Sequence, residues 1–221
     1  MGINCLPSPK MRAAADELAA DVGREGGTTV VLPADVTDSR SVSEMFETCE
    51  RQLGPVDVLI TNAADLRETP WDLVDLQVWE SMLRVNATGT FLCAQLAVES
   101  MRHRGGGAII TVSSATVELG YGASVPYITS KGAVIAFTRA LARVAGPDNI
   151  RVNTVMPGAI ETETTRELEP PGAREEIMKG QCLRRGGTAA DLAGTFVFLA
   201  SSASSFITGQ VIAVDGGLVH Y

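Results

Sequence analysis

Tyr127 stands four positions before Lys131 in the segment PYITSKGAV, residues 126–134. Residues spaced i,i+4 on a helix share one face and lie within reach of each other. A phenol ordinarily ionises at roughly pH 10, and a neighbouring ammonium group lowers that pKa because it favours the phenolate. The pair therefore predicts a general acid/base. The same spacing also fits a surface tyrosine packed along a lysine stem, so the pair needs support from its surroundings.

Ser114 and Asn86 are two further polar residues at positions where chemistry could be placed. Ser114 follows an apolar run and precedes Tyr127 by thirteen residues, which is enough chain to return to the same rim. A serine after a strand is otherwise ordinary turn chemistry. Asn86 falls inside a long helical pattern, where asparagine has poor propensity and competes for backbone hydrogen bonds. A local kink that holds a water would explain it, and so would a tolerated polar residue.

The elements that must position these residues alternate along the chain. Apolar periodicity predicts helices at 9–22, 41–54, 76–104, 130–146 and 189–202, and strands at 28–33, 56–60, 106–112, 150–155 and 210–214. Nearly continuous apolar strands between amphipathic helices are typical of a parallel sheet covered on both faces. We predict a single α/β domain over residues 1–221 with a doubly wound parallel sheet.

Ligands of such sheets bind beyond the carboxyl ends of the strands. The residues that follow the predicted strands are small and polar: Ala34-Asp35-Val36, Asn62-Ala63-Ala64, Ser113-Ser114-Ala115 and Pro157-Gly158. Each could also be an ordinary strand-ending turn. The polar insertion at 161–187 interrupts the alternation, and we interpret it as a mobile substrate flap with a short helix. An ornamental surface loop is the alternative.

Composition excludes several classes of function. The net charge of -8 argues against nucleic acid as a partner, and no basic stripe offsets it. No apolar run is long enough to span a membrane, so we expect a soluble protein. Four scattered cysteines and two histidines argue against a disulfide framework and a metal site, and favour a reducing cytoplasm.

Together, Asn86, Ser114, Tyr127 and Lys131 resemble the catalytic tetrad of the short-chain dehydrogenase/reductase family. Further segments resemble its motifs in the same order: ADVTD at 34–38, TNAA at 61–64, PGAIET at 157–162 and ITGQVIAVDGG at 207–217. The resemblance covers about residues 10–219. It implies a Rossmann-like fold and hydride transfer between NAD(P) and a secondary alcohol or ketone. Ala64 departs from the glycine that the family usually has, and we expect it to be tolerated.

The resemblance also implies roles for the residues. Tyr127 would exchange a proton with the substrate oxygen, and Ser114 would orient that oxygen. Lys131 would lower the pKa of the phenol and hold the nicotinamide ribose, while Asn86 would order a relay water. On the cofactor side the implied contacts are Asp35 and Val36 with adenine, Asn62 and Ala63 with the adenosine ribose, Pro157, Gly158 and Ile160 with nicotinamide, and Thr162 with the carboxamide or phosphates.

The family's glycine-rich turn, which holds the pyrophosphate between a first strand and a first helix, has no counterpart that we find. The glycine clusters at 23–27 and 105–107 follow helices, and Gly186-Gly187 has no strand before it. We therefore expect a chain shortened at the front by about 35 residues, without the first strand, the first helix and most of the second strand. In the family's strand order, 3-2-1-4-5-6-7, the missing part lies between residues 28–33 and 56–60. Dinucleotide binding would then be weakened.

Three functions stay open at this point. The first is an NAD(P)-dependent oxidoreductase, and the second is a non-catalytic member that acts as an oligomer partner. The third, epimerisation or dehydration, is disfavoured by the short C-terminal part. Asn4-Cys5 stands where an acidic or basic residue would select the cofactor, which slightly favours NADP. The substrate is equally open between sugars and 3-oxoacyl compounds.

The family builds a homotetramer through two helix faces. The corresponding residues here are Phe91, Ala94 and Val98 on one helix and Val134, Phe137 and Leu141 on the other. We therefore expect a homo-oligomer, with core packing against the sheet as the alternative use of these residues.

Overall fold

The structure is a computed structural model, and it describes residues 1–168 and 172–220. Its main strands are β1 (Gly2–Cys5), β2 (Val30–Pro33), β3 (Val58–Thr61), β4 (Gly107–Val112), β5 (Ile150–Pro157) and β8 (Val211–Val214). All pair in parallel, as β1-β2 in one sheet and β3-β4-β5-β8 in another. The predicted parallel α/β architecture is confirmed, and its strands and helices alternate as expected.

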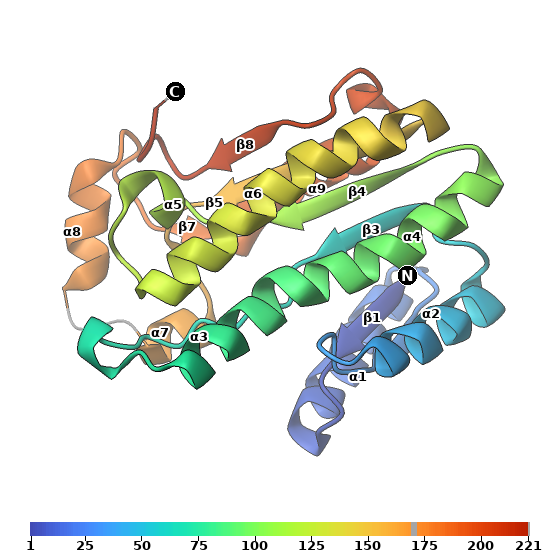
Figure 1. The fold of residues 1–221 in the computed structure, drawn as a ribbon, viewed down its shortest axis with the longest axis horizontal. Coiled ribbons are helices and arrows are strands. Elements are labelled where there is room, and N and C mark those ends of the chain that lie inside the picture. Colours follow the sequence, from blue (N-terminus) through green and yellow to red (C-terminus); the bar gives the residue numbers. More distant parts are fainter. Residues whose placement is uncertain (169–171, 221) are drawn as a thin grey trace.

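The N-terminal part is a small βαβα unit. Helix α1 (Pro9–Arg24) follows β1, and α2 (Ser39–Leu53) follows β2. Ser8 caps α1 by accepting from the Met11 amide, and Pro9 stands in the first turn, where its missing N–H costs nothing. Figure 1 shows this unit beside β3 and α4, set apart from the larger sheet.

The four-stranded sheet carries the centre of the molecule. Its middle strands β4 and β5 are almost wholly buried, and β4 pairs along its full length from Gly107 to Val112. Helices α4 (Gly89–Arg104) and α6 (Val125–Ala145) pack on one face, and α9 (Ala189–Ala200) packs on the other. Apolar side chains from both helices and both middle strands form the main core. The sheet is therefore covered on both faces, as the continuous apolar strands predicted.

Strand β3 is an edge strand, and its side chains show it. Val58 is 37% exposed and Ile60 is 44% exposed, although both are apolar. Among the described residues no strand lies between β3 and β1, which belongs to the other sheet. β3 therefore ends the larger sheet, and β1 pairs with β2 over its whole length.

The long helical run predicted at 76–104 is real but changes its winding in the middle. Helix α3 (Leu76–Leu83) passes into a π-helical turn at Arg84–Thr88 and then into α4. Asn86 lies in that turn. The predicted irregularity at this residue is therefore confirmed, and π-turns are frequent at functional sites.

The insertion at 161–187 is more ordered than a bare flap. It opens on β6 (Ile160–Glu161) and closes on β7 (Gly187–Thr188), which pair in parallel. Between them lie the short helices α7 (Glu163–Leu168) and α8 (Ala173–Gly180). Residues 169–171 of the predicted flap lie outside the described residues.

The two helix faces predicted to build an oligomer divide between core and surface. Val134 is buried, but it lines the groove between α4 and α6. Ala94 and Val98 are buried in the main core, so the assignment is wrong for these two. They pack in the core because the apolar stripe of α4 is wide enough to serve the core first. Phe91 is exposed, while Phe137 and Leu141 are half-buried at the margin of the core. No helix in the described part of the chain is long and apolar enough to cross a bilayer.

Candidate active site

The carboxyl ends of the large sheet's strands open onto a cavity of about 820 Å³. In Figure 1 these strand ends lie on the left, where the short helix α5 (Thr116–Leu119) and the helices of the insertion gather. Four predicted site residues line this cavity together: Ser114, Tyr127, Pro157 and Gly158. Ser114 follows β4, Tyr127 lies in the first turn of α6, and Pro157 ends β5. The sequence positions predicted to share one rim do so.

Tyr127 is largely buried, and its pKa is raised. Burial is the largest cause, because it disfavours the charged phenolate. The hydroxyl of Ser114 acts in the opposite direction, and the charge of Glu68 raises the pKa further. The predicted downward shift is therefore wrong for this structure, since Lys131 is not among the causes. Its Nζ atom lies 5.8 Å from the centroid of the tyrosine ring.

Lys131 is itself buried, at 2% exposure, beneath the tyrosine. Burial lowers the pKa of its ammonium group to about 8. Its Nζ donates to the Val112 carbonyl oxygen at 2.9 Å, and Ser113 Oγ donates to the Lys131 carbonyl oxygen at 3.0 Å. A lysine that loses its proton near neutrality is suited to pass one between the phenol and solvent.

Asn86 is 1% exposed, and its side chain hydrogen-bonds two other segments of the site. Its Oδ1 accepts from the Asp65 amide at 2.7 Å, and its Nδ2 donates to the Asp65 carbonyl oxygen at 3.1 Å. The same Nδ2 lies 2.9 Å from Ser130 Oγ, which donates to the Tyr127 carbonyl oxygen at 2.7 Å. The side chain thus fixes the loop after β3 and the first turn of α6 together.

Ser130 and Ser113 belong to this site and were not assigned by sequence reasoning. Ser130 Oγ ties the Tyr127 backbone to Asn86, and Ser113 Oγ holds the Lys131 backbone. Both are fully buried hydroxyls that directly precede a site residue in the chain. Their position next to a candidate catalytic residue could have identified these two serines from the sequence.

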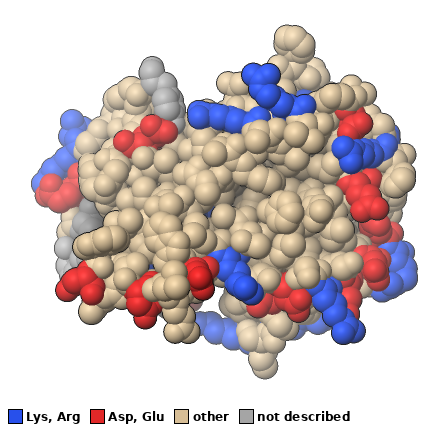
Figure 2. Space-filling model, viewed as in Figure 1, with Lys and Arg blue, Asp and Glu red and all other residues tan. Residues whose placement is uncertain are grey.

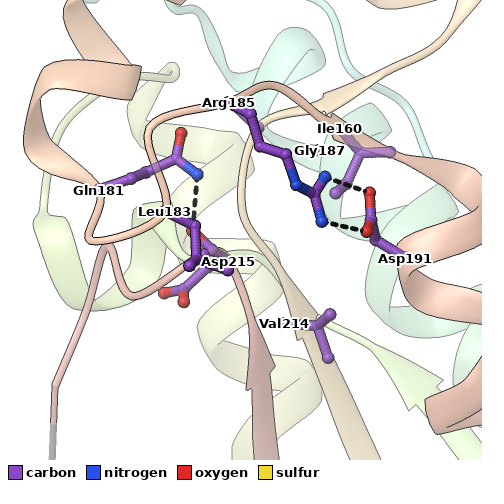
Figure 3. A pocket seen from close by; sticks show the side chains of 10 residues that line it. Ile160, Gln181, Leu183, Arg185, Gly187, Asp191, Val214 and Asp215 are labelled. Carbon is purple, nitrogen blue, oxygen red and sulfur yellow. Dashed lines mark hydrogen bonds and ion pairs between the residues drawn. The ribbon is translucent and has the colours of Figure 1, made fainter.

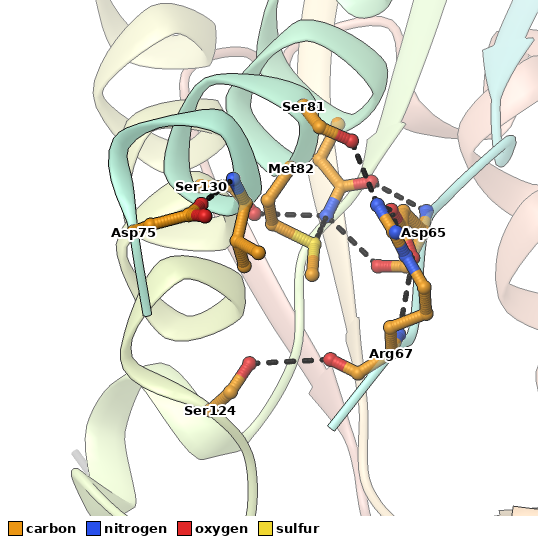
Figure 4. Close-up of polar contacts among 9 residues, drawn as sticks. Asp65, Arg67, Asp75, Ser81, Met82, Ser124 and Ser130 are labelled. Atoms are coloured by element: carbon orange, nitrogen blue, oxygen red, sulfur yellow. Dashed lines mark hydrogen bonds and ion pairs between the residues drawn. The ribbon is translucent and has the colours of Figure 1, made fainter. Parts of the chain in front are cut away.

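The loop after β3 is anchored on the side away from the cavity. Arg67 forms an ion pair with Asp65, and its guanidinium donates to Ser81 Oγ at 2.7 Å, as Figure 4 shows. Ser124 Oγ donates to the Arg67 carbonyl oxygen at 3.3 Å. The hydrogen bonds with Arg67 hold the pKa of Asp65 below its usual value, although burial raises it. Leu66 and Glu68 line the cavity instead.

The predicted adenine-side residues lie away from this cavity. Asp35 Oδ1 accepts from the Thr37 amide at 2.9 Å, which makes the turn after β2. Val36 is buried, and a Cβ on Gly89 would come within 2.9 Å of its side chain, so Val36 packs closely against α4. Asn62 and Ala63 are exposed after β3. Their contacts with a cofactor stay predictions.

Ile160 and Thr162 are also placed apart from the tetrad. Thr162 Oγ1 accepts from the Thr165 amide at 3.1 Å and so begins α7. Ile160 lines a smaller cavity of about 220 Å³, shown in Figure 3. There Arg185 forms two hydrogen bonds with Asp191, and Gln181 Nε2 donates to the Asp215 carbonyl oxygen at 3.1 Å. These contacts hold the end of the insertion against β8.

The described residues contain no phosphate-binding turn, as the sequence predicted. Gly26 and Gly105 have positive φ and end helices α1 and α4, which is the usual use of glycine at that place. Within 1–168 and 172–220, no glycine-rich turn leads from a strand into a helix. The described residues therefore include no amide cradle for a pyrophosphate.

Comparison with known proteins agrees with this geometry. Residues 6–219 match the family model described as Enoyl-(Acyl carrier protein) reductase. The 5-keto-D-gluconate 5-reductase of Escherichia coli K12 is 34% identical over 218 residues, which are 98% of this chain and 84% of that protein. The 3-oxoacyl-[acyl-carrier-protein] reductase FabG of Thermotoga maritima is 35% identical, over 93% of this chain and 88% of that one.

A solved structure extends the likeness to three dimensions. Gluconate 5-dehydrogenase from Burkholderia cenocepacia J2315, in complex with NADP and tartrate, superposes with a TM-score of 0.89. It is 32% identical, and the match covers 98% of this chain and 84% of that chain. A sheet of this topology with a tyrosine, a serine and a buried lysine at one rim defines an oxidoreductase of the α/β class. The chain belongs to the short-chain dehydrogenase/reductase family, whose members transfer hydride with NAD(P).

The residues around the large cavity fit the reactive end of that cofactor. Pro157 and Gly158 line the cavity beside Tyr127, with Lys131 beneath the ring. A Cβ on Gly158 would come within 2.8 Å of the Asp215 backbone, so only glycine allows the loop after β5 to lie this close to β8. NAD(P) bound here would supply the hydride.

Proposed function

We propose that the chain interconverts a secondary alcohol and a ketone, with Tyr127 as the general acid and base. In the reducing direction the phenol donates its proton to the substrate oxygen as the carbon accepts hydride. Ser114 hydrogen-bonds the same oxygen and favours the developing alkoxide. Lys131 returns a proton to Tyr127, and Asn86 acts as a positioning residue that holds the turn carrying Tyr127.

A single observation carries this proposal. Ser114 and Tyr127 line the wall of one cavity, and Lys131 is buried directly behind the tyrosine ring. Packing alone does not require a largely buried phenol above a lysine, because both groups lose hydration. The raised pKa of Tyr127 keeps the phenol protonated, which is the form that reduction needs.

The experiment is the oxidation of NADPH and of NADH, followed by nicotinamide absorbance, with a panel of neutral ketones. We expect turnover by the wild type and none by Tyr127→Phe. Cofactor affinity is measured separately by calorimetry with NADPH. Turnover retained in Tyr127→Phe would contradict the assignment of the acid.

A non-catalytic member that joins other subunits is the second candidate. The lack of an amide cradle among the described residues favours it, because several backbone hydrogen bonds to phosphate are then not available. Calorimetry distinguishes the two: affinity for NADPH typical of the family would exclude this candidate, and no detectable binding would support it.

The α4 and α6 face is the surface through which we propose a homotetramer. A shallow cavity of about 350 Å³ lies between the two helices, lined by Phe91, Thr90 and Phe137 among others. Figure 2 shows that the middle of this face carries few charged side chains, which gather nearer its rim. Light scattering on the wild type and on Phe91→Glu tests the proposal, since a charge there should lower the oligomeric mass.

Two further assignments rest on smaller observations. We favour NADP over NAD because Asn4 is neutral and its Nδ2 is held by the carbonyl oxygens of Leu32 and Ala34, at 3.0 and 3.1 Å. No carboxylate therefore competes with a ribose phosphate at that place. We propose the cytoplasm as the compartment, since Cys5, Cys49, Cys93 and Cys182 are all free thiols. The ratio of kcat/KM for NADPH and NADH tests the first assignment.

A further inference from the structure

We propose that Glu68 makes the substrate cavity select neutral, largely apolar ketones and alcohols and reject substrates that carry a carboxylate. The inference names the substrate class of the reaction above and so rests on that proposed function. In this proposal Glu68 is a specificity-determining residue. It affects which substrates bind next to Tyr127 and takes no part in the chemical step.

The wall of the cavity is mainly apolar. Leucine, isoleucine and tyrosine side chains from four segments line it: Leu66, Leu119, Tyr121, Ile177 and Leu218. A substrate body that buries these side chains gains roughly 25 cal/mol for each Å² of apolar surface removed from water. A polyol offers little such surface and would leave hydroxyl groups facing carbon. The lining therefore suits an aryl or alkyl group beside the reacting carbon.

Glu68 contributes a carboxylate to this wall, and the described residues offer it no ion-pair partner. The side chain of Glu68 is exposed and lines the same cavity as Tyr127, so it lies where an entering substrate passes. Partial burial raises the pKa of Glu68, and its charge makes a small contribution to the raised pKa of Tyr127. The cation of this loop, Arg67, pairs with Asp65 and donates to Ser81 Oγ, as Figure 4 shows, and it does not line the cavity.

The other acidic residue of the wall is already paired. Glu176 forms an ion pair with Lys179 on the same helix. No lysine or arginine is among the residues that line the cavity in the described part of the chain. A substrate carboxylate would thus meet the charge of Glu68 without a cation beside it.

None of the insertion's cations lines the cavity in the described part of the chain. Arg166 pairs with Glu161, and Arg185 pairs with Asp191. Arg174 donates to Thr165 Oγ1 at 3.4 Å and does not line the cavity. Positions 164, 167–171 and 173 contain neither lysine nor arginine in the sequence. The insertion therefore adds no cation to the cavity to balance Glu68.

Two of the relatives described above are named for reactions of gluconate or its 5-keto form, and such sugar acids carry a carboxylate. The cavity of this chain carries the Glu68 carboxylate and should therefore disfavour a substrate carboxylate. Similar sequence and fold can accompany a different substrate class, because substrate choice depends on the residues that line the site.

A pair of probes that differ only in charge tests the inference. Methyl 4-oxo-4-phenylbutanoate and 4-oxo-4-phenylbutanoate are the same aryl ketone as an ester and as a carboxylate. Binding of each to the full chain is measured by ligand-observed NMR, and reduction is measured by loss of NADPH absorbance. We expect the ester to bind about tenfold more tightly, since like charges repel in a partly desolvated site.

The variant Glu68→Gln removes the charge and keeps the shape. It should tighten binding of the acid about tenfold and leave binding of the ester within about twofold. Glu118→Gln is the matched control, because Glu118 lies on α5 between two lining residues but is exposed and does not line the cavity. It should change neither affinity.

The outcomes separate the inference from the function on which it rests. Equal or tighter binding of the acid to the wild type, or tighter binding of 5-keto-D-gluconate than of the ester, would overturn the charge selection. An unchanged ester-to-acid ratio in Glu68→Gln would do the same. If the ester binds selectively but is never reduced, the proposed reaction fails and the selectivity of the cavity stands.

Discussion

The two sheets of the molecule make different contributions to the site. The four-stranded sheet has buried middle strands, and the residues after β4 and β5 meet Tyr127 at one cavity. The two-stranded sheet carries Asp35 and Val36, and within the described residues no strand joins it to β3. What holds the two together is side-chain packing, since Val36, Val42 and Phe46 share the main core with α4.

This difference separates chemistry from cofactor affinity. Residues that act on the substrate are fixed by hydrogen bonds within and around the larger sheet, so their geometry does not depend on the N-terminal unit. Residues that would hold the adenosine half lie on a unit attached mainly through apolar contacts, to which Ser100 Oγ adds a hydrogen bond with the Glu50 carboxylate. Variants in the two regions should therefore affect different constants, kcat for the first region and cofactor affinity for the second.

The largest effect should come from Tyr127→Phe. Removing the hydroxyl removes the proton donor, and we expect kcat to fall about 10³-fold with cofactor affinity unchanged. The matched control is Tyr121→Phe, because Tyr121 lines the same cavity from an exposed position. Its kcat should change less than about threefold. A comparable fall in both variants would show that the cavity wall, and not the acid, limits turnover.

Asn86→Ala should have the next largest effect, on stability. The change leaves the Asp65 amide and carbonyl and the Ser130 hydroxyl without their partner in a buried site. We expect a loss of about 3 kcal/mol in the free energy of unfolding, measured with urea. Asn62→Ala, at an exposed position, serves as the control and should cost less than about 0.5 kcal/mol. Equal losses would mean that the π-turn does not depend on the network.

Alkaline pH should stabilise the protein through Lys131. The folded pKa is about 8 and the unfolded value is 10.5, so between these values the unfolded chain binds more protons and stability rises with pH. From pH 8 to pH 10 the rise from this group is about 2 kcal/mol, and below pH 8 the penalty of burying the charge is present in full. In Lys131→Met the midpoint of urea unfolding should rise less between pH 8 and pH 10 than in Lys179→Met, which is the control at an exposed lysine. A rise that persists in Lys131→Met would assign it to another group.

Most of the architecture could be predicted because it follows from local patterns. A continuous apolar run indicates the strand that begins at Gly107, and apolar residues at i,i+4 spacing indicate the helix that carries Tyr127. These patterns are local, so contacts with other elements do not change them. The convergence of Ser114 and Tyr127 followed from the rule that strand ends of a parallel sheet share a rim.

What could not be predicted depends on burial and on competing partners. The pKa of Tyr127 moves up and not down, because desolvation outweighs the opposing effect of Ser114, and Lys131 makes no resolved contribution. Val98 looked available for an interface, but only the packed structure shows that it faces the core. The sequence did not indicate a role for Glu68. Its proposed role depends on the loop conformation in which Arg67 donates to Ser81 and does not line the cavity.

The smallest effect should come from the N-terminal unit, through Asp35→Ala. The carboxylate is proposed to accept a hydrogen bond from the adenine amino group, so its loss should raise the Kd for NADPH about fivefold. The value of kcat at saturating cofactor should stay the same, because Asp35 lies on the smaller sheet's side of the molecule. The variant also removes the bond from the Thr37 amide, and Ser41→Ala controls for this. It releases the Asp35 amide, which donates to Ser41 Oγ at 3.1 Å, and keeps the carboxylate. If Ser41→Ala weakens NADPH as much as Asp35→Ala does, the turn and not the carboxylate governs affinity. A fall in kcat in either variant would show that the two sheets are coupled more tightly than their shared core suggests.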